Sequence, residues 1–391
     1  GLGDVYKRQL LYNRHFMPCG FLKAAKELAA EYYQNNQMMT ISLYISILLL
    51  AFIAYQSLDK EADPFMAKCF HWALFLFLVL FATFRDGSLL PDYHTYVKIF
   101  RVNEQSSHVE QSFYTIRSIV HFFLAHNGEL LLFFIYAVLG IGIKYYAIKK
   151  YSAYVMFSLC IWVSSFYILQ DLIQIRASVA GGLLLVIIPL VQQRRFWTAV
   201  LLTFIAFLFH NSALIFVPIF FMNAQSINRK FWFSGYLLAV VINITHFDFA
   251  FYFNQLLRLI PSGFINERIS QYLLREYVVN DTRIFMFSPY IIMQTLISMA
   301  ILWKVDKVKY FSPFAILLLK VSFFSIYIYS LSIPGVSMRL AELLSTVQIL
   351  LSPLIIYFYP YKYRYIGGST VILIGLLTLT NFIFFKHFIM L

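Results

Sequence analysis

The chain has 391 residues, of which 61% are hydrophobic and 13% charged, and its formal net charge is +13. A soluble globular domain carries about 25% charged residues, so this composition excludes an ordinary soluble domain. Apolar runs of about 20 residues, enough to cross a hydrocarbon core about 30 Å thick, recur along the chain without period-two alternation, which predicts a polytopic helical membrane protein.

The basic excess does not indicate nucleic-acid binding, because Lys and Arg fall mainly in short loops, as the positive-inside rule requires. Cys19, Cys69 and Cys160 have no spacing typical of a metal site or a disulfide framework. The nine histidines form no HExxH or HxxxH pattern. The sequence also has no Walker loop and no dinucleotide-binding glycine pattern. We therefore expect no metal, no cofactor and no nucleic-acid partner.

Residues 1–37 differ from everything after them. GLGDVYKRQ is typical of a cloning or sequence-assembly remnant, so it is excluded from the fold prediction. Met38 or Met39 immediately precedes the apolar run TISLYISILLLAFIAY, and we expect the native chain to start there. The domain prediction is a non-native or disordered leader over 1–37 and a single multi-pass membrane domain over 38–391, with long polar loops at 85–112 and 246–288.

The membrane spans are predicted from the apolar runs. The range 113–125 is apolar but short and contains Arg117, which favours an interfacial or re-entrant segment. The range 196–222 is interrupted by His210-Asn211-Ser212, which favours two short or tilted helices that bring His210 into a polar cavity. The other predicted crossings are 38–55, 69–84, 130–148, 153–169, 177–191, 231–245, 289–303, 313–331, 343–359 and 367–385.

Basic residues follow many of these spans, and placing them in the cytoplasm gives a consistent topology of about twelve crossings with both ends outside. An alternative topology makes 113–125 a true span and inverts everything downstream. In the preferred topology several polar stretches share the extracytoplasmic side. These stretches are 85–112, 170–176, 210–212, 246–288 and 332–340.

The segment 170–182, QDLIQIRASVAGG, lies between two apolar runs and carries the strongest functional signal. An ionisable residue at a membrane segment is costly and usually faces the bundle interior. Arg176 does not readily lose its proton, so either it has a fixed anionic partner in the bundle or it binds an anionic ligand. Asp171 and Gln174 lie in the same segment and are candidates for substrate binding.

A second group precedes it, at Arg85-Asp86 and Asp92-Tyr93 with Tyr96. In a helix Asp92 and Tyr96 would be one turn apart and could face the same pocket. Asp92 either caps a helix in a solvated loop or accepts the proton of an incoming hydroxyl.

Two further positions remain open between structural and functional roles. His210 is either a hydrogen-bonded bundle residue or a proton shuttle or phosphate donor. Arg339 and Glu342 are three residues apart and either pair along a helix or face the site.

Arginines, a histidine and carboxylates on one face suit the displacement of a pyrophosphate anion by a hydroxyl. The guanidinium groups hold the phosphate oxygens and a carboxylate or histidine takes the proton.

Four blocks of sequence, FRDGSLLPDYHTYVKIF, VEQSFYTI, LQDLIQIRASVAGGLLL and FLFHNSALIFVPIFF, resemble in order and spacing the EpsG family of Wzy-like exopolysaccharide polymerases. The likeness covers residues 39–385. It implies an all-helical fold related to lipid-linked-sugar glycosyltransferases and O-antigen ligases. The matched positions are Arg85, Asp92, Tyr93, Tyr96, Glu110, Gln174, Arg176 and His210, and more loosely Arg339.

The resemblance implies polymerisation of undecaprenyl-pyrophosphate-linked oligosaccharide repeats at the outer face of the bacterial cytoplasmic membrane, with a flippase and a chain-length regulator as candidate partners. A lipid-linked-sugar transporter or flippase, a non-catalytic scaffold and a membrane acyltransferase are the alternatives. The predicted catalytic residues are Arg176, His210, Asp92 and Arg85. The predicted substrate-binding residues are Asp86, Tyr93, Tyr96, Glu110, Asp171, Gln174, Arg339 and Glu342.

Overall fold

The computed structural model describes residues 64–85, 92–101, 110–124, 128–245, 288–333 and 336–382, with single positions 44, 50, 53, 54, 87, 90 and 247. Every regular element in these ranges is a helix, which confirms the all-α prediction. The expected leader, most of the expected first span at 38–55 and most of the polar stretch 246–288 lie outside the described residues.

The amino-terminal half contains the helices that carry most of the predicted site. Two of them are not α-helical, because η2 is a π-helix and η3 is a 3-10 helix. In chain order they are α3 (Pro64–Thr83), α4 (Tyr93–Arg101), α5 (Gln111–Leu124), α6 (Glu129–Tyr151), α7 (Val155–Ile161), η2 (Trp162–Ile173), α8 (Ile175–Gln192), α9 (Phe196–Phe209), η3 (Asn211–Phe221) and α10 (Arg229–Ile244).

The carboxy-terminal half completes the bundle. It contributes one long bent unit, α16 to η4, to the centre of the molecule and one helix, α18, to its edge. Its elements are α13 (Pro289–Trp303), α14 (Val305–Val308), α15 (Ala315–Ser330), α16 (Ser337–Ser345), α17 (Gln348–Leu351), η4 (Ser352–Phe358), η5 (Tyr361–Tyr363) and α18 (Arg364–Thr380).

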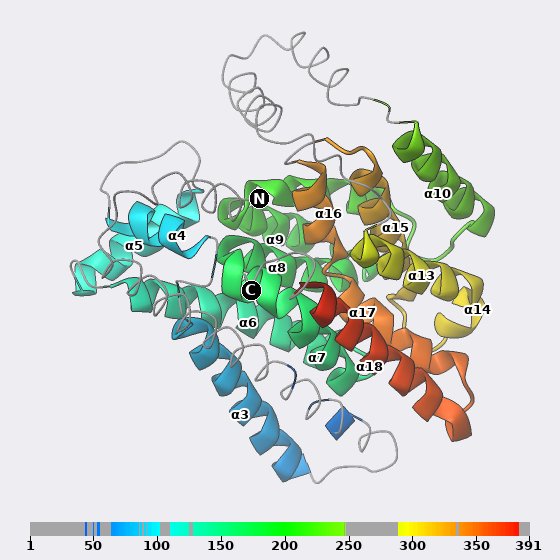
Figure 1. The fold of residues 1–391 in the computed structure, drawn as a ribbon, viewed down its shortest axis with the longest axis horizontal. Helices are drawn as coiled ribbons and strands as arrows, with labels where there is room; N and C mark the ends of the chain where they lie inside the picture. The colour runs from blue at the N-terminus through cyan, green and yellow to red at the C-terminus, as the bar shows by residue number, and fades with distance from the viewer. Residues whose placement is uncertain are drawn as a thin grey trace, which may run out of the picture.

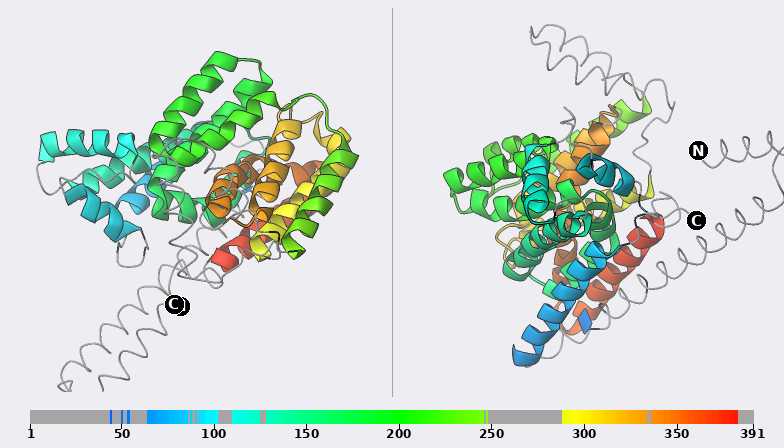
Figure 2. Two further views of the ribbon diagram at one scale, coloured as in Figure 1. Left: turned by 90° about the horizontal axis from the view of Figure 1, so that it is seen from above. Right: turned by 90° about the vertical axis from the view of Figure 1, so that its left-hand side faces the viewer.

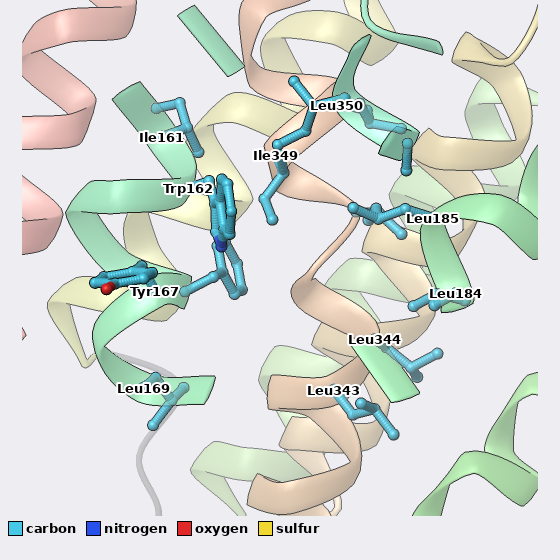
Figure 3. Close-up of a cluster of buried hydrophobic side chains, with 14 of the residues drawn as sticks. Ile161, Trp162, Tyr167, Leu169, Leu184, Leu185, Leu343, Leu344, Ile349 and Leu350 are labelled. Atoms are coloured by element: carbon cyan, nitrogen blue, oxygen red, sulfur yellow. The ribbon is translucent and has the colours of Figure 1, made fainter. Parts of the chain in front are cut away.

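Helix α8 occupies the centre of the bundle and packs against α6 on one side and α9 on the other (Figure 1). Most residues of α8 are buried, as expected of an apolar helix covered on most sides by protein. In the core, Trp162 and Tyr167 of η2 belong to the same cluster of buried hydrophobic side chains as Leu184 of α8 and Leu344 of α16 (Figure 3). The rigid framework that holds Arg176 is therefore built from segments far apart in the chain.

Exposure separates central helices from peripheral ones. The apolar window of α7–η2 is 94% buried, whereas that of α3 is only 17% buried. Helices α3 and α18 run along the edge of the bundle (Figure 2). The exposed face of α3 is rich in Phe, Trp and Leu, and that of α18 carries Leu, Ile and Tyr, which is the composition expected of surfaces in contact with lipid.

The count of about twelve crossings is not confirmed. Among the described residues six helical stretches are long and apolar enough to cross a membrane, and four shorter apolar helices accompany them. The range 196–222 is two short helices with His210 between them, as predicted. The expected span 231–245 corresponds to α10, which is in neither group. The candidate crossings are 65–83, 129–151, 155–173, 175–192, 337–358 and 361–380.

The short helix α5 corresponds to the segment 113–125 that was expected to be interfacial or re-entrant. It has 14 residues, fewer than a crossing requires. Arg117 is buried, and its Nη1 donates to the Ile99 carbonyl oxygen at 3.1 Å. This bond satisfies a carbonyl in the last turn of α4, one that α4 itself leaves unpaired. Arg117 is thus explained by the packing of α4 on α5.

The basic loops gather at one end of the bundle. Lys307 Nζ donates to the Phe358 carbonyl oxygen at 3.1 Å, and Arg229 pairs with Asp306. The rings of Phe311 and Tyr357 stack with centroids 4.1 Å apart. Helices α6 and α8 both end toward this side, with Lys149-Lys150 and Arg194-Arg195 at or just beyond their last turns. The polar residues described next lie at the other end.

Candidate functional site

The site begins where the polar segment 170–176 breaks. The π-helix η2 ends at Ile173, and Gln174 leaves helical geometry with φ −96° and ψ 62° before α8 starts. Arg176 lies in the first turn of α8. Asp171 lies on η2, before the break, and Arg176 lies after it. The two side chains therefore point in different directions, although they are only five positions apart. π-helical turns of this kind often occur at functional sites.

Arg176 forms an ion pair with Glu110, which immediately precedes α5. The Glu110 side chain is 6% exposed and that of Arg176 is 21% exposed, so the guanidinium reaches the open side of the pair. Of the two alternatives that the sequence left open for Arg176, the structure shows a fixed anionic partner. The partial exposure leaves room for an anionic ligand as well.

The same carboxylate also contacts the tip of the α9–η3 hairpin. Glu110 Oε1 lies 3.2 Å from His210 Nδ1 and accepts from the backbone N–H of Asn211 at 3.4 Å. Burial, reinforced by the positive charges of Arg176 and Arg339, lowers the pKa of His210 to about 3. The imidazole is therefore neutral at neutral pH, and Nδ1 carries the proton that it donates to Glu110. Nε2 is then the proton-accepting nitrogen.

Tyr96 and Asp92 form the adjoining wall, on and just before α4. The guanidinium carbon of Arg176 lies 5.5 Å from the centroid of the Tyr96 ring. The Tyr96 N–H donates to the Asp92 carbonyl oxygen at 3.0 Å, so the two residues are one turn apart, as predicted. Burial raises the pKa of Asp92, while the charges of Arg176 and Arg339 oppose that shift.

Arg85 is enclosed by aromatic rings directly after α3. Its guanidinium carbon lies 4.2 Å from the centroid of Phe133 and 5.9 Å from that of Tyr93. The Tyr93 ring stacks on Phe133 and also covers Gly87, where any Cβ would overlap that ring. Nη1 donates to the Ala82 carbonyl oxygen, whereas the buried Nε and Nη2 have no partner among the described residues.

The charges in this cluster are predominantly positive. Arg339 lies on α16, and its charge acts on both Asp92 and His210, which places it at the same end as Arg176. Arg85 acts electrostatically on Tyr96, which Arg176 also contacts. Arg176 and Arg339 thus act on Asp92 and on the neutral His210, Arg176 also pairs with the buried Glu110, and Arg85 is linked to this group through Tyr96. Such a set favours anions that carry several oxygens.

Asp171 was predicted to bind substrate, and the structure places its carboxylate in the interior of the bundle. Its Oδ1 accepts from Lys144 Nζ at 2.9 Å and from the Ser178 hydroxyl, and its Oδ2 accepts from Trp162 Nε1 at 2.9 Å. The side chains of Lys144 and Asp171 are 0% and 1% exposed. All of these partners lie within the bundle, so the carboxylate is occupied by structural donors. Lys144, a lone lysine in the apolar run 130–148, was the signal that sequence analysis overlooked.

The remaining predicted residues differ in how they relate to the cluster. Tyr93 reaches it through Arg85 and Phe133. Gln174 is half-buried at the break between η2 and α8. Glu342 is 3% exposed and acts electrostatically on Tyr290 of α13, which places it in the interior of the bundle. Asp86 lies outside the described residues.

Within the described part of the chain, no three His, Cys, Asp or Glu side chains gather closely enough to hold a metal ion. The fold and the cluster together define a multi-pass helical membrane protein with an arginine-rich polar cluster at one end of its bundle. The model of the EpsG family matches residues 68–390, and the chain belongs to this family. No curated protein and no solved structure shows significant similarity to the chain.

Proposed function

We propose that this protein is a polysaccharide polymerase that joins undecaprenyl-pyrophosphate-linked oligosaccharide repeats at the outer face of the bacterial cytoplasmic membrane. Membership in the EpsG family supports a polymerase role. The observation that carries the proposal is the convergence of Arg176 and His210 on Glu110, from positions 66 and 100 residues further along the chain. This arrangement holds an anion-binding group beside a proton acceptor.

The reaction is a displacement at the anomeric carbon of the donor chain. A hydroxyl oxygen of the acceptor repeat forms a bond to that carbon, and the bond from the carbon to the pyrophosphate oxygen breaks. The electron pair leaves with undecaprenyl pyrophosphate. Arg176, Arg85 and Arg339 hold the phosphate oxygens and stabilise the charge that develops as this bond breaks. The buried Nε and Nη2 of Arg85, which have no partner in the part of the chain that the structure describes, are suited to such an anion.

The proton of the acceptor hydroxyl goes to Nε2 of His210. Glu110 accepts the Nδ1 proton, fixes the tautomer and stabilises the imidazolium that forms. Before substrate binds, Arg176 and Arg339 help to lower the pKa of His210. A bound pyrophosphate offsets their charge and raises that pKa, so the base becomes competent only when the lipid donor is in place. Asp92 and Tyr96 orient the acceptor sugar.

The test is reconstitution in liposomes with a lipid-linked repeat unit and chelator, without nucleotide, and with products resolved as a ladder on a gel. Replacing Arg176 by Ala should lower the rate by about 10²–10³-fold, as expected for loss of one donor to a developing anion. Arg195→Ala, a change at the opposite end, is the matched control and should extend chains normally. Polymer of normal length from folded Arg176→Ala protein would refute the proposal.

His210 and Asp92 are separated as proton acceptors by their pH profiles. His210→Gln should lose about 10²–10⁴-fold in rate and should abolish the fall in rate at acid pH. Asp92→Asn should raise the KM for the acceptor and keep that fall. If Asp92→Asn instead removes it, the proton acceptor is Asp92. Movement of labelled lipid-linked sugar across the bilayer without any ladder would favour a flippase instead.

A further inference from the structure

A hollow lies at the opposite end of the bundle from the Arg176 site. It has a volume of about 690 Å³ and lies between residues 67–75 of α3 and residues 142–149 of α6. The α3 wall is Lys68, His71, Trp72 and Phe75, at positions i, i+3, i+4 and i+7 of one helical face. Ala67 of α3 completes it.

The wall on α6 has the same spacing. It consists of Gly142, Tyr145, Tyr146 and Lys149, again at i, i+3, i+4 and i+7. The two helices run in opposite directions, so the hollow has lysines at one end and Phe75 facing Gly142 at the other. Seven residues of helix separate its ends, which is about 10 Å at 1.5 Å per residue.

The hollow is fixed by hydrogen bonds between its walls. The Tyr145 hydroxyl donates to the His71 carbonyl oxygen at 2.9 Å, and it lies 2.7 Å from His71 Nδ1, from which it accepts. The rings of Phe75 and Tyr145 meet edge to face with centroids 5.8 Å apart. These contacts hold α3 against α6 near the middle of the hollow. The space beside Gly142 stays open, because a Cβ added to Gly142 would meet only Phe75, at 3.9 Å.

We infer that this hollow binds one anionic phospholipid. The phosphate lies between the ammonium groups of Lys68 and Lys149, both of which are exposed. An acyl chain follows the aromatic side of α3 past Trp72 and lies against the open face of Gly142. The length of about 10 Å spans the distance from a headgroup to the upper part of an acyl chain.

Position and composition favour a lipid over a water-soluble anion. α3 is one of the most exposed candidate spans, so the mouth of the hollow faces lipid. Its floor is aromatic and aliphatic, with cations only at the rim. Each basic group beside an anionic membrane surface raises affinity about fivefold. Lys149, at the charged end of the hollow, is about 24 Å along α6 from Phe133, counting 16 residues at 1.5 Å, so this lipid headgroup is in the leaflet opposite the Arg176 site.

The test is native mass spectrometry of the full chain in detergent, titrated with phosphatidylglycerol and, in parallel, with phosphatidylcholine. One phosphatidylglycerol should bind tightly to the unaltered protein, and phosphatidylcholine should bind weakly. Lys68→Gln with Lys149→Gln should weaken phosphatidylglycerol binding about 25-fold, about fivefold for each charge. Lys304→Gln with Lys362→Gln is the matched control and should change it less than about twofold, since neither lysine lines the hollow.

A second variant tests the shape of the hollow without changing its charge. Gly142→Leu fills the open face and also favours the α6 helix, so the protein should fold. Its phosphatidylglycerol affinity should fall at least about tenfold, because the acyl chain loses its place against α6.

Unchanged affinity in Gly142→Leu, or equal losses in the lysine pair and its control, would show that lipid is attracted only by surface charge. Equally tight binding of glycerol phosphate would show that the ligand is a soluble anion. Each of these results would overturn the inference, and none depends on polymerase activity.

Discussion

Breaking the buried pair between Lys144 and Asp171 should lower the stability of the protein rather than impair its chemistry. The pair is 2.9 Å long and both side chains are fully enclosed between α6, η2 and α8. Lys144→Met removes the positive charge and leaves the carboxylate with two neutral donors, Trp162 and Ser178. Asp171→Asn leaves the ammonium without its counter-ion.

Removing one partner of a buried ion pair costs about 3–5 kcal/mol, because the remaining charge stays buried without compensation. At about 2–4 °C per kcal/mol, each single variant should melt about 6–20 °C lower than the unaltered protein. The double variant, Lys144→Met with Asp171→Asn, should recover most of the loss, since no charge is left in the bundle. The amide oxygen that replaces the carboxylate still accepts from Trp162 Nε1.

The assay is thermal unfolding of the purified protein in detergent, followed by tryptophan fluorescence, with chain extension in liposomes measured at a temperature where all variants are folded. The double variant should extend chains at close to the normal rate. If Asp171→Asn stops chain extension while its melting temperature is unchanged, Asp171 acts on substrate and the assignment of the pair to folding is refuted.

Three further outcomes follow from the geometry. Burial raises the pKa of Asp92 in the folded state, so Asp92→Asn should be more stable than the unaltered protein at neutral pH, with a gap that closes as pH falls toward about 4, measured by thermal unfolding. Gly140→Ala places a Cβ on top of the Ser178 hydroxyl and should cost about 1–3 kcal/mol, and adding Ser178→Ala should restore part of it. Phe133→Leu removes the ring that covers Arg85 and should cost about 1–2 kcal/mol, with slower chain extension. An unchanged melting temperature in any of the three would contradict the corresponding contact.

The helical class and the break at His210 were predictable because each depends on local sequence. Composition and long apolar runs indicate membrane helices, and three polar residues in an apolar run indicate an interruption. The alternatives for Arg176 were also correctly limited, since a guanidinium in a bundle needs an anion. No local pattern predicted Glu110 as the partner of Arg176, because 66 residues separate the two in sequence.

The burial of each helix and the structural partners of Asp171 could not be predicted from the sequence, for a physical reason. Hydropathy measures whether a segment avoids water, and it does not distinguish a helix covered by lipid from one covered by protein. Thus α3 and η2 look alike in sequence but differ greatly in burial. Asp171 was assigned by its nearness in sequence to Arg176, whereas the change from a π-helix to an α-helix at Gln174 turns the two side chains toward different partners.

The separation between Lys144 and Asp171 also has a consequence for biogenesis. During synthesis α6 emerges before its counter-ion, which follows 27 residues later. At about 5–20 residues per second this delay is about 1–5 s. A lone lysine near the middle of a membrane helix costs about 2.5–3.5 kcal/mol at insertion. The other residues of α6, a 23-residue helix with mean hydropathy 1.9, offset that cost, so α6 can insert alone and wait for η2.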